Sequence, residues 1–146
     1  MLLLWYSINE DLKGAILPYM PFITFTLLKG RSADEKKVLG DCAQTALMSV
    51  GVPEKDRFQR FIELESDQFI FDRDYPNLET PRSDQFIMIE ILLSVGRSVK
   101  IKRELLKNLI SNLQTRAGVR PHDVMVVMKE TAWENWAFSD GEMHHV

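Results

Sequence analysis

A proline that directly follows a methionine, Pro21 after Met20, could do chemistry in this 146-residue chain. If translation starts at Met20 and that methionine is removed, Pro21 becomes a free secondary amine. In an apolar pocket with cationic neighbours the protonated amine is disfavoured, so its pKa falls toward neutrality, as a general base requires. If residues 1–20 stay attached, the proline nitrogen is an amide without basicity, and Pro21 only starts a strand.

Two arginines occupy matching Gly-Arg-Ser turns, Arg31 in Gly30-Arg31-Ser32 and Arg97 in Gly96-Arg97-Ser98. Each turn is expected where a strand ends and a helix begins, which is where open α/β sheets bind ligands. The guanidinium fork matches a carboxylate. Either arginine could instead be a solvated turn residue, and repetition of the architecture could explain their similarity without any function.

Asp56, in a turn before an expected strand, is a candidate for orienting or activating water. The alternative is a turn-stabilising aspartate paired with a neighbouring base. Trp136 and Phe138 belong to an aromatic-rich tail after the last expected strand. They could line an apolar pocket or pack under a terminal hairpin.

Other chemistries find little support in the sequence. A single cysteine, Cys42, excludes an intramolecular disulfide and favours a reducing, cytoplasmic location. The histidines, His122, His144 and His145, lack metal-ligand spacing, and no P-loop or dinucleotide fingerprint occurs. We therefore expect no metal and no cofactor.

Charge and hydropathy exclude two classes of partner. With 18 basic and 21 acidic residues the net charge is −3, which gives no basic surface for nucleic acid. No apolar run approaches the roughly 18 residues of a membrane helix. We expect one compact domain that binds neither nucleic acid nor membrane.

Period-two alternation begins at Phe22, and Ser32 with Glu35 forms the capping-box pattern that opens a helix. A second helix is expected between Ser98 and Gly118. Strands are expected at 22–28, about 58–64, about 86–93 and 124–128, with a further short one at 69–71.

The pattern strand, Gly-Arg-Ser, helix, Gly-Val, proline turn, Asp, strand occurs twice. Arg31 and Arg97 are 66 residues apart (97 − 31), and Asp56 and Asp123 are 67 apart (123 − 56). Such self-similarity predicts a duplicated β-α-β unit. The fold class is therefore α+β (α/β), a four-stranded sheet with two helices on one face. Ile87 occupies the position that matches Pro21, so the architecture does not require a proline there.

Two helices cover only one face of this sheet, yet the third strand is apolar on both sides, which is typical of burial on both faces. Self-association into a closed cyclic oligomer would cover the second face.

We expect residues 1–19 to be an N-terminal extension, either the result of a mis-assigned start codon or a real arm. Residues 20–146 form the domain, with repeats at about 21–64 and 86–130 followed by the aromatic tail.

Residues 20–146 resemble the tautomerase superfamily, in particular its 4-oxalocrotonate tautomerase and malonate semialdehyde decarboxylase-like branch. The motifs that show this are Met20-Pro21, Gly30-Arg31-Ser32, Gly51-Val52-Pro53, Asp56-Arg57-Phe58-Gln59, Arg82-Ser83, Gly96-Arg97-Ser98 and Asn135-Trp136-Ala137-Phe138-Ser139. The resemblance implies the duplicated fold, a homotrimer and an amino-terminal catalytic proline.

It also implies roles for single residues. Asp56 matches a catalytic aspartate, Arg97 a substrate-binding arginine, and Trp136 and Phe138 aromatic pocket walls. Arg31 matches an arginine that is functional in the short tautomerases. The decarboxylase has a further arginine where this chain has Val95, which argues against decarboxylation.

Three functions follow from the residues and the resemblance together. The first is a cofactor-independent tautomerase of small 2-oxo acids, with Pro21 as general base, Arg97 on the substrate carboxylate and Asp56 positioning water or a hydroxyl. The second is a malonate semialdehyde decarboxylase or hydratase. The third is a non-catalytic trimeric domain in which the extension is retained.

Overall fold

The computed structural model describes residues 20–143, so the expected extension at 1–19 and the histidines at 144 and 145 lie outside it. Four strands and two long helices follow one another in the order that the repeat predicts. Their bounds are β1 Phe22–Leu28, α2 Ala33–Ser49, β2 Phe58–Leu64, β3 Ile87–Ser94, α3 Val99–Ala117 and β4 Val124–Thr131, with short 3-10 helices at Pro121–Asp123 and Trp133–Asn135.

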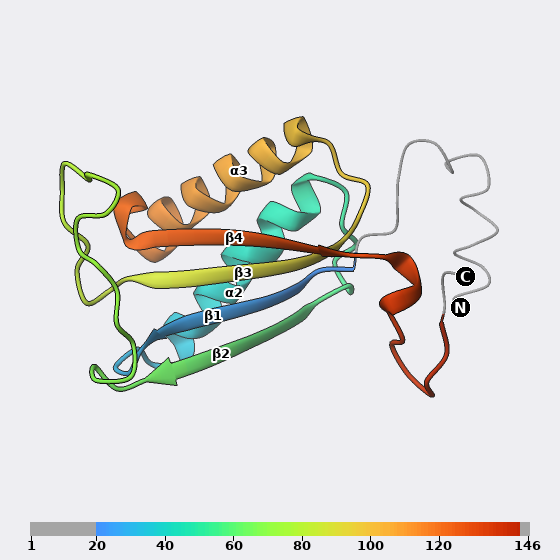
Figure 1. The fold of residues 1–146 in the computed structure, drawn as a ribbon, viewed down its shortest axis with the longest axis horizontal. Helices are drawn as coiled ribbons and strands as arrows, with labels where there is room; N and C mark the ends of the chain where they lie inside the picture. The colour runs from blue at the N-terminus through green and yellow to red at the C-terminus, as the bar shows by residue number, and fades with distance from the viewer. Residues whose placement is uncertain (1–19, 144–146) are drawn as a thin grey trace.

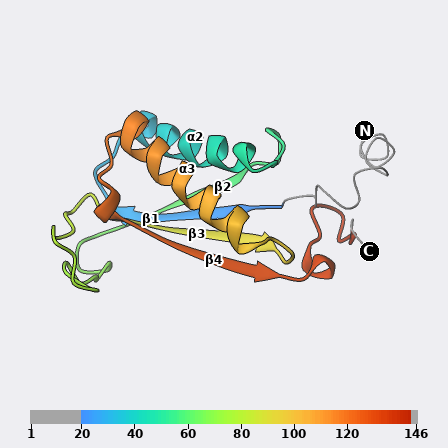
Figure 2. The same cartoon turned by 90° about the horizontal axis from the view of Figure 1, so that it is seen from above.

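The strands form one sheet in the order β2-β1-β3-β4. Each repeat pairs its own strands in parallel, β1 with β2 and β3 with β4, while β1 and β3 pair antiparallel at the centre. Both helices cover the same face of the sheet (Figures 1 and 2). The predicted fold class, a duplicated β-α-β unit with two helices on one face, is confirmed.

Antiparallel pairing of the repeats gives the sheet two unlike ends. At one end, which we call the Pro21 end, the first residues of β1 and β2, Phe22 and Phe58, lie beside the last residues of β3 and β4, Ser94 and Thr131. At the other, which we call the Arg31 end, β1 and β2 finish while β3 and β4 begin. Residues far apart in the sequence therefore meet at each end.

The core lies between the sheet and the two helices. Alternate residues of β1 and β3 face the helices and are almost fully buried, as Phe25 and Ile89 are. Phe25 also stacks on Phe61 of β2, with ring centroids 4.6 Å apart. The helices contribute a buried side made chiefly of Leu39, Cys42, Ala46, Leu47, Leu105, Leu109 and Leu113.

The opposite face of the sheet has no helix over it. On β3, Met88 and Leu92 point to that face and are only half-buried, and Met125 of β4 is 42% exposed. These apolar side chains stay uncovered in one chain, beside the ion pair of Glu90 and Lys129 on the same face. The predicted self-association stays a prediction.

The long connection between β2 and β3 differs from the expectation, because no strand forms at 69–71. Phe69 and Phe71 instead pack against Phe86, with ring centroids 5.6 and 4.4 Å away. Packing of these rings on Phe86 thus takes the place of the expected strand pairing. A short apolar run in the sequence is compatible with either arrangement. Within residues 20–143, no helix is both long and apolar enough to span a membrane.

The start of α2 is held by the expected capping box. The Ser32 hydroxyl accepts from the Glu35 amide at 3.1 Å, and the Glu35 carboxylate accepts from the Ser32 amide at 2.6 Å. Ser98 caps α3 in the same way but without the reciprocal glutamate. These caps determine where each Gly-Arg-Ser turn ends and so where its arginine sits.

Removal of the hydroxyl in Ser32→Ala leaves the Glu35 amide without its acceptor. We expect the free energy of unfolding to fall by about 1 kcal/mol, measured by urea denaturation. Ser111→Ala removes an exposed hydroxyl from the interior of α3 and is the control. It should be neutral or slightly stabilising, because alanine is the better helix former. An equal loss in both variants would contradict a capping role.

Candidate active site

Pro21 lies at the Pro21 end of the sheet, buried, in the residue before β1. Met20, bonded to its nitrogen, is also buried, at 3% exposure. With Met20 in place the proline nitrogen is an amide and cannot accept a proton. Burial at this position would lower the pKa of an amine there, and only cleavage after Met20 would create that amine.

The structure brings Arg97 and Asp56 to this same end. Arg97 follows β3 by three residues, and its guanidinium donates to the Ser94 carbonyl oxygen. The turn that carries it needs Gly96, whose φ of 114° an L side chain rarely adopts. Asp56 lies two residues before Phe58, the residue paired with Phe22. The positive charge of Arg97 acts to lower the pKa of the Asp56 carboxyl, which shows that the two groups lie close enough to interact.

Asp56 has the most perturbed acidity of this group. Burial raises the pKa of Asp56 to about 6, and the Arg97 charge acts in the opposite direction. A carboxyl with such a pKa is present in both protonation states near neutral pH. As a carboxylate it can accept a hydrogen bond from a reacting molecule, and as a protonated carboxyl it can donate one.

Gln44 positions the Asp56 turn. Its side-chain amide nitrogen on α2 donates to the carbonyl oxygens of Pro53 at 3.3 Å, Glu54 at 3.2 Å and Asp56 at 3.3 Å. The side chain is 3% exposed. We did not expect this residue from the sequence. The one available signal was a polar residue on the side of α2 that otherwise carries buried alanines.

Aromatic rings form a wall at the Pro21 end. Phe138 stacks on Trp136 at 5.9 Å and on Phe58 at 6.0 Å between ring centroids. Trp136 and Phe138 come from the tail after β4, whereas Phe58 begins β2. Phe58, which is 49% exposed, is a further candidate for this wall. From the sequence we expected it only as part of a strand and of a family motif.

Arg31 lies at the other end of the molecule. β1, seven residues long, separates it from Pro21 by about 20 Å at roughly 3.3 Å per residue. Its guanidinium donates to the Gln85 carbonyl oxygen at 2.8 Å. Within one chain, Arg31 therefore does not join the group formed by Pro21, Asp56, Arg97, Trp136 and Phe138, and its role in substrate binding stays a prediction.

Metal ligands do not gather in the described part of the chain. Among residues 20–143 no group of three or more histidine, cysteine, aspartate or glutamate side chains could hold a metal ion.

The pKa of Asp56 predicts how stability depends on pH. Because this pKa lies above the ordinary value of 3.8, the folded chain binds the carboxyl proton more tightly than the unfolded chain. The resulting stabilisation is complete below pH 4 and is lost as the pH rises through 6. Asp56→Asn removes the titration. Between pH 4 and pH 8 its free energy of unfolding should therefore gain about 1–2 kcal/mol on that of the wild type, once solvent screening of this partly exposed carboxyl is taken into account.

Urea denaturation at both pH values measures this gain. Asp67→Asn, which changes an exposed aspartate, is the matched control and should show none. If the difference between Asp56→Asn and the wild type were the same at pH 4 and pH 8, the raised pKa would be wrong.

Comparison with known proteins identifies the family of this chain. A family model described as tautomerase enzyme matches residues 56–139. The probable tautomerase YusQ of Bacillus subtilis (strain 168) is 31% identical over 123 residues, which cover 84% of this chain and 95% of that protein. The residues matched by the family model include Asp56, Arg97, Trp136 and Phe138.

Solved structures share the fold. A malonate semialdehyde decarboxylase, solved in wild-type, proline-mutant and inactivated forms, matches with a TM-score of 0.79 and 27% identity over 85% of this chain and 95% of its own. A fused 4-OT symmetric trimer matches with a TM-score of 0.66 and 18% identity over 83% and 94%, which shows likeness of fold alone. On the family model and the curated relative together, this chain belongs to the tautomerase family.

Proposed function

We propose that this protein is a cofactor-independent tautomerase of small 2-oxo acids, with Pro21 as the general base once residues 1–20 are absent. The observation that supports this best is the meeting of a buried Pro21, an Asp56 of raised pKa and Arg97 at one end of the sheet. Family membership supports the reaction class. The malonate semialdehyde decarboxylase of like fold has also been solved with its first-position proline replaced by alanine.

In the proposed reaction Arg97 binds the substrate carboxylate through its guanidinium fork. With the enol of a 2-oxo acid, the Pro21 nitrogen accepts the enol O–H proton, and the resulting Pro21 ammonium returns a proton to C3. The C2=C3 double bond becomes C2=O, so no atom is lost and no oxidant is needed. Asp56 holds the substrate oxygen or a water in place. Because its pKa is about 6, it can change between accepting and donating a hydrogen bond as the substrate proton moves.

The surroundings suit a proline base. The aromatic wall of Trp136 and Phe138 removes water from the site, which disfavours the charged ammonium form. The positive charge of Arg97 disfavours that form further. Both effects lower the pKa of the Pro21 amine toward neutrality, where a general base is most effective.

We also propose that the protein is a homotrimer in the cytoplasm. The apolar sheet face without a helix supports the association, and the fused 4-OT proteins of like fold are trimers. A trimer would place the Arg31 end of one copy near other copies. That is the only way in which Arg31 could serve a site at the Pro21 end.

Decarboxylation or hydration of malonate semialdehyde is the second candidate. The likeness to the decarboxylase, at 27% identity, favours it. Val95 argues against it, because the side chain two residues before Arg97 offers no second cation for a carboxylate that leaves as carbon dioxide. Retention of residues 1–20 leads to the third candidate, a trimeric domain without catalysis.

The natural N-terminus and a Pro21→Ala variant test the role of the proline. We expect intact mass of natively expressed protein to show a chain that starts at Pro21. Pro21→Ala in that chain should lower kcat/KM for phenylenolpyruvate ketonisation by about 100-fold or more, the usual contribution of a general base. Pro81→Ala, in the β2–β3 connection, is the control. Full activity of Pro21→Ala, or a mature chain starting at Met1, would exclude the proposed mechanism.

A pair of substrates separates the two reactions. The Pro21-initiated protein should ketonise phenylenolpyruvate, followed by ultraviolet absorbance, and release no carbon dioxide from malonate semialdehyde. Arg97→Gln should abolish most of the ketonisation through a raised KM, because the carboxylate loses its cation. Carbon dioxide release from malonate semialdehyde at a comparable kcat/KM would favour the decarboxylase instead.

A further inference from the structure

The internal repeat gives the active site a counterpart at the Arg31 end. Asp123 corresponds to Asp56, and Arg31 corresponds to Arg97. At the Pro21 end the aspartate comes from the first repeat and the arginine from the second. At the Arg31 end the contributions are exchanged, because β1 and β3 are antiparallel. The Asp123 charge acts on Arg31 as the Arg97 charge acts on Asp56.

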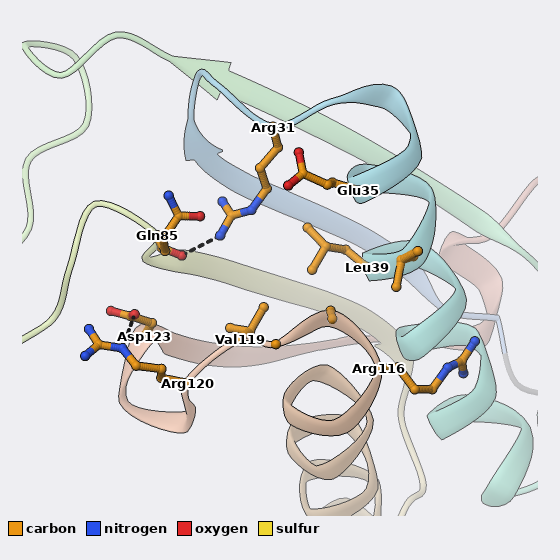
Figure 3. Close-up of a pocket in the computed structure, with 11 residues that line it drawn as sticks. Arg31, Glu35, Leu39, Gln85, Arg116, Val119, Arg120 and Asp123 are labelled. Atoms are coloured by element: carbon orange, nitrogen blue, oxygen red, sulfur yellow. Dashed lines mark hydrogen bonds and ion pairs between the residues drawn. The ribbon is translucent and has the colours of Figure 1, made fainter.

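A cavity of about 330 Å³ opens beside this second pair. Figure 3 shows the Arg31 guanidinium turned toward Gln85, with Leu39 and Val119 across the hollow and Arg120 beside Asp123. Val38 and Ala117 complete the apolar part of the wall. The rest of the lining is polar or charged, with Glu35 and Asp123 as acidic and Arg31, Arg116 and Arg120 as basic side chains. The volume lies within the range of small-molecule sites.

Arg31 is suited to bind an anion here. Burial lowers the pKa of its guanidinium, and the Glu35 and Asp123 charges only partly offset the lost solvation. The described bond to Gln85 uses one of five N–H donors. Glu35 is already bonded to the Ser32 amide. A carboxylate bound in the cavity would accept hydrogen bonds from the Arg31 guanidinium in place of water.

The second end lacks the groups for catalysis. Ile87 matches Pro21, and it is fully buried inside the chain with no amine. Burial raises the pKa of Asp123, but hydrogen bonds from Ser83 and Arg120 outweigh it and leave that pKa below its ordinary value. Asp123 is thus a permanent carboxylate that holds Ser83 and Arg120 in place.

We propose that the cavity at Arg31 is a second, non-catalytic binding site for a small carboxylate with a short apolar body. The guanidinium binds the carboxylate, and the wall of Val38, Leu39, Ala117 and Val119 receives the apolar part. This site stands independently of the proposed reaction, because it requires neither a free Pro21 nor turnover.

Isothermal titration calorimetry of the full-length chain with 3-phenylpropanoate tests the site. This probe has the skeleton of phenylenolpyruvate but no carbonyl to tautomerise. Besides any binding at Arg97, we expect a separate binding event that Arg31→Gln weakens by about tenfold or more, the scale of a charge-assisted hydrogen bond. Arg97→Gln should leave that event unchanged.

Two further variants separate a site from general effects. Ala117→Phe fills the cavity without changing any charge and should abolish the same event, which keeps the test valid if Arg31→Gln fails to fold. Lys107→Gln removes an exposed cation of α3 and should have no effect. The proposal is overturned if the probe does not bind, if Arg31→Gln and Ala117→Phe both leave binding intact, or if Arg97→Gln removes all of it.

Discussion

The antiparallel pairing of β1 with β3 is the constraint on which the rest of this structure depends. It joins two parallel β-α-β units head to tail, with Phe22 opposite Leu92 and Leu27 opposite Ile87. Every strand start of one unit therefore lies beside a strand end of the other. A parallel arrangement of the units would have put Arg97 at the far end from Pro21. The candidate active site exists because this ladder runs the opposite way.

Duplication then allows the two ends to differ in chemistry while they share a scaffold. Both have an arginine in a Gly-Arg-Ser turn and an aspartate before a strand. At one end the aspartate is poorly solvated and has a pKa of about 6, which suits proton transfer. At the other it accepts three hydrogen bonds, two from Ser83 and one from Arg120, and stays ionised. The hydrogen-bond partners and the burial, rather than the residue type, give these two carboxyls pKa values on opposite sides of the ordinary value.

Much of the fold was predictable because its signals are local. Alternation in 22–28, the Ser32 capping box and the glycines after each helix act within a few residues of one another, so they are visible in one dimension. The repeat added long-range information, since two copies of one unit must build the same structure. The failed strand at 69–71 shows the limit: Phe69 and Phe71 pack on Phe86, a residue whose distance in space no local pattern reveals.

The residues of the candidate site could be predicted from the sequence, but which of them lie together in the fold could not. Pro21, Asp56, Arg97, Trp136 and Phe138 were all identified from the sequence and the resemblance, and the structure brings them to one end. Arg31 was identified with them and lies at the opposite end. Gln44 and Phe58 were missed, because their roles consist of contacts across elements: three carbonyl oxygens of a turn for Gln44, and the ring of Phe138 for Phe58.

By itself, the sequence determined the elements, the duplication and the difference between Pro21 and Ile87, because propensity, capping and periodicity are properties of neighbouring residues. The tertiary structure alone decided which arginine faces which aspartate, how strongly each carboxyl is desolvated and where a cavity opens. Those outcomes depend on strand direction and burial. Both arise only when the two repeats pair.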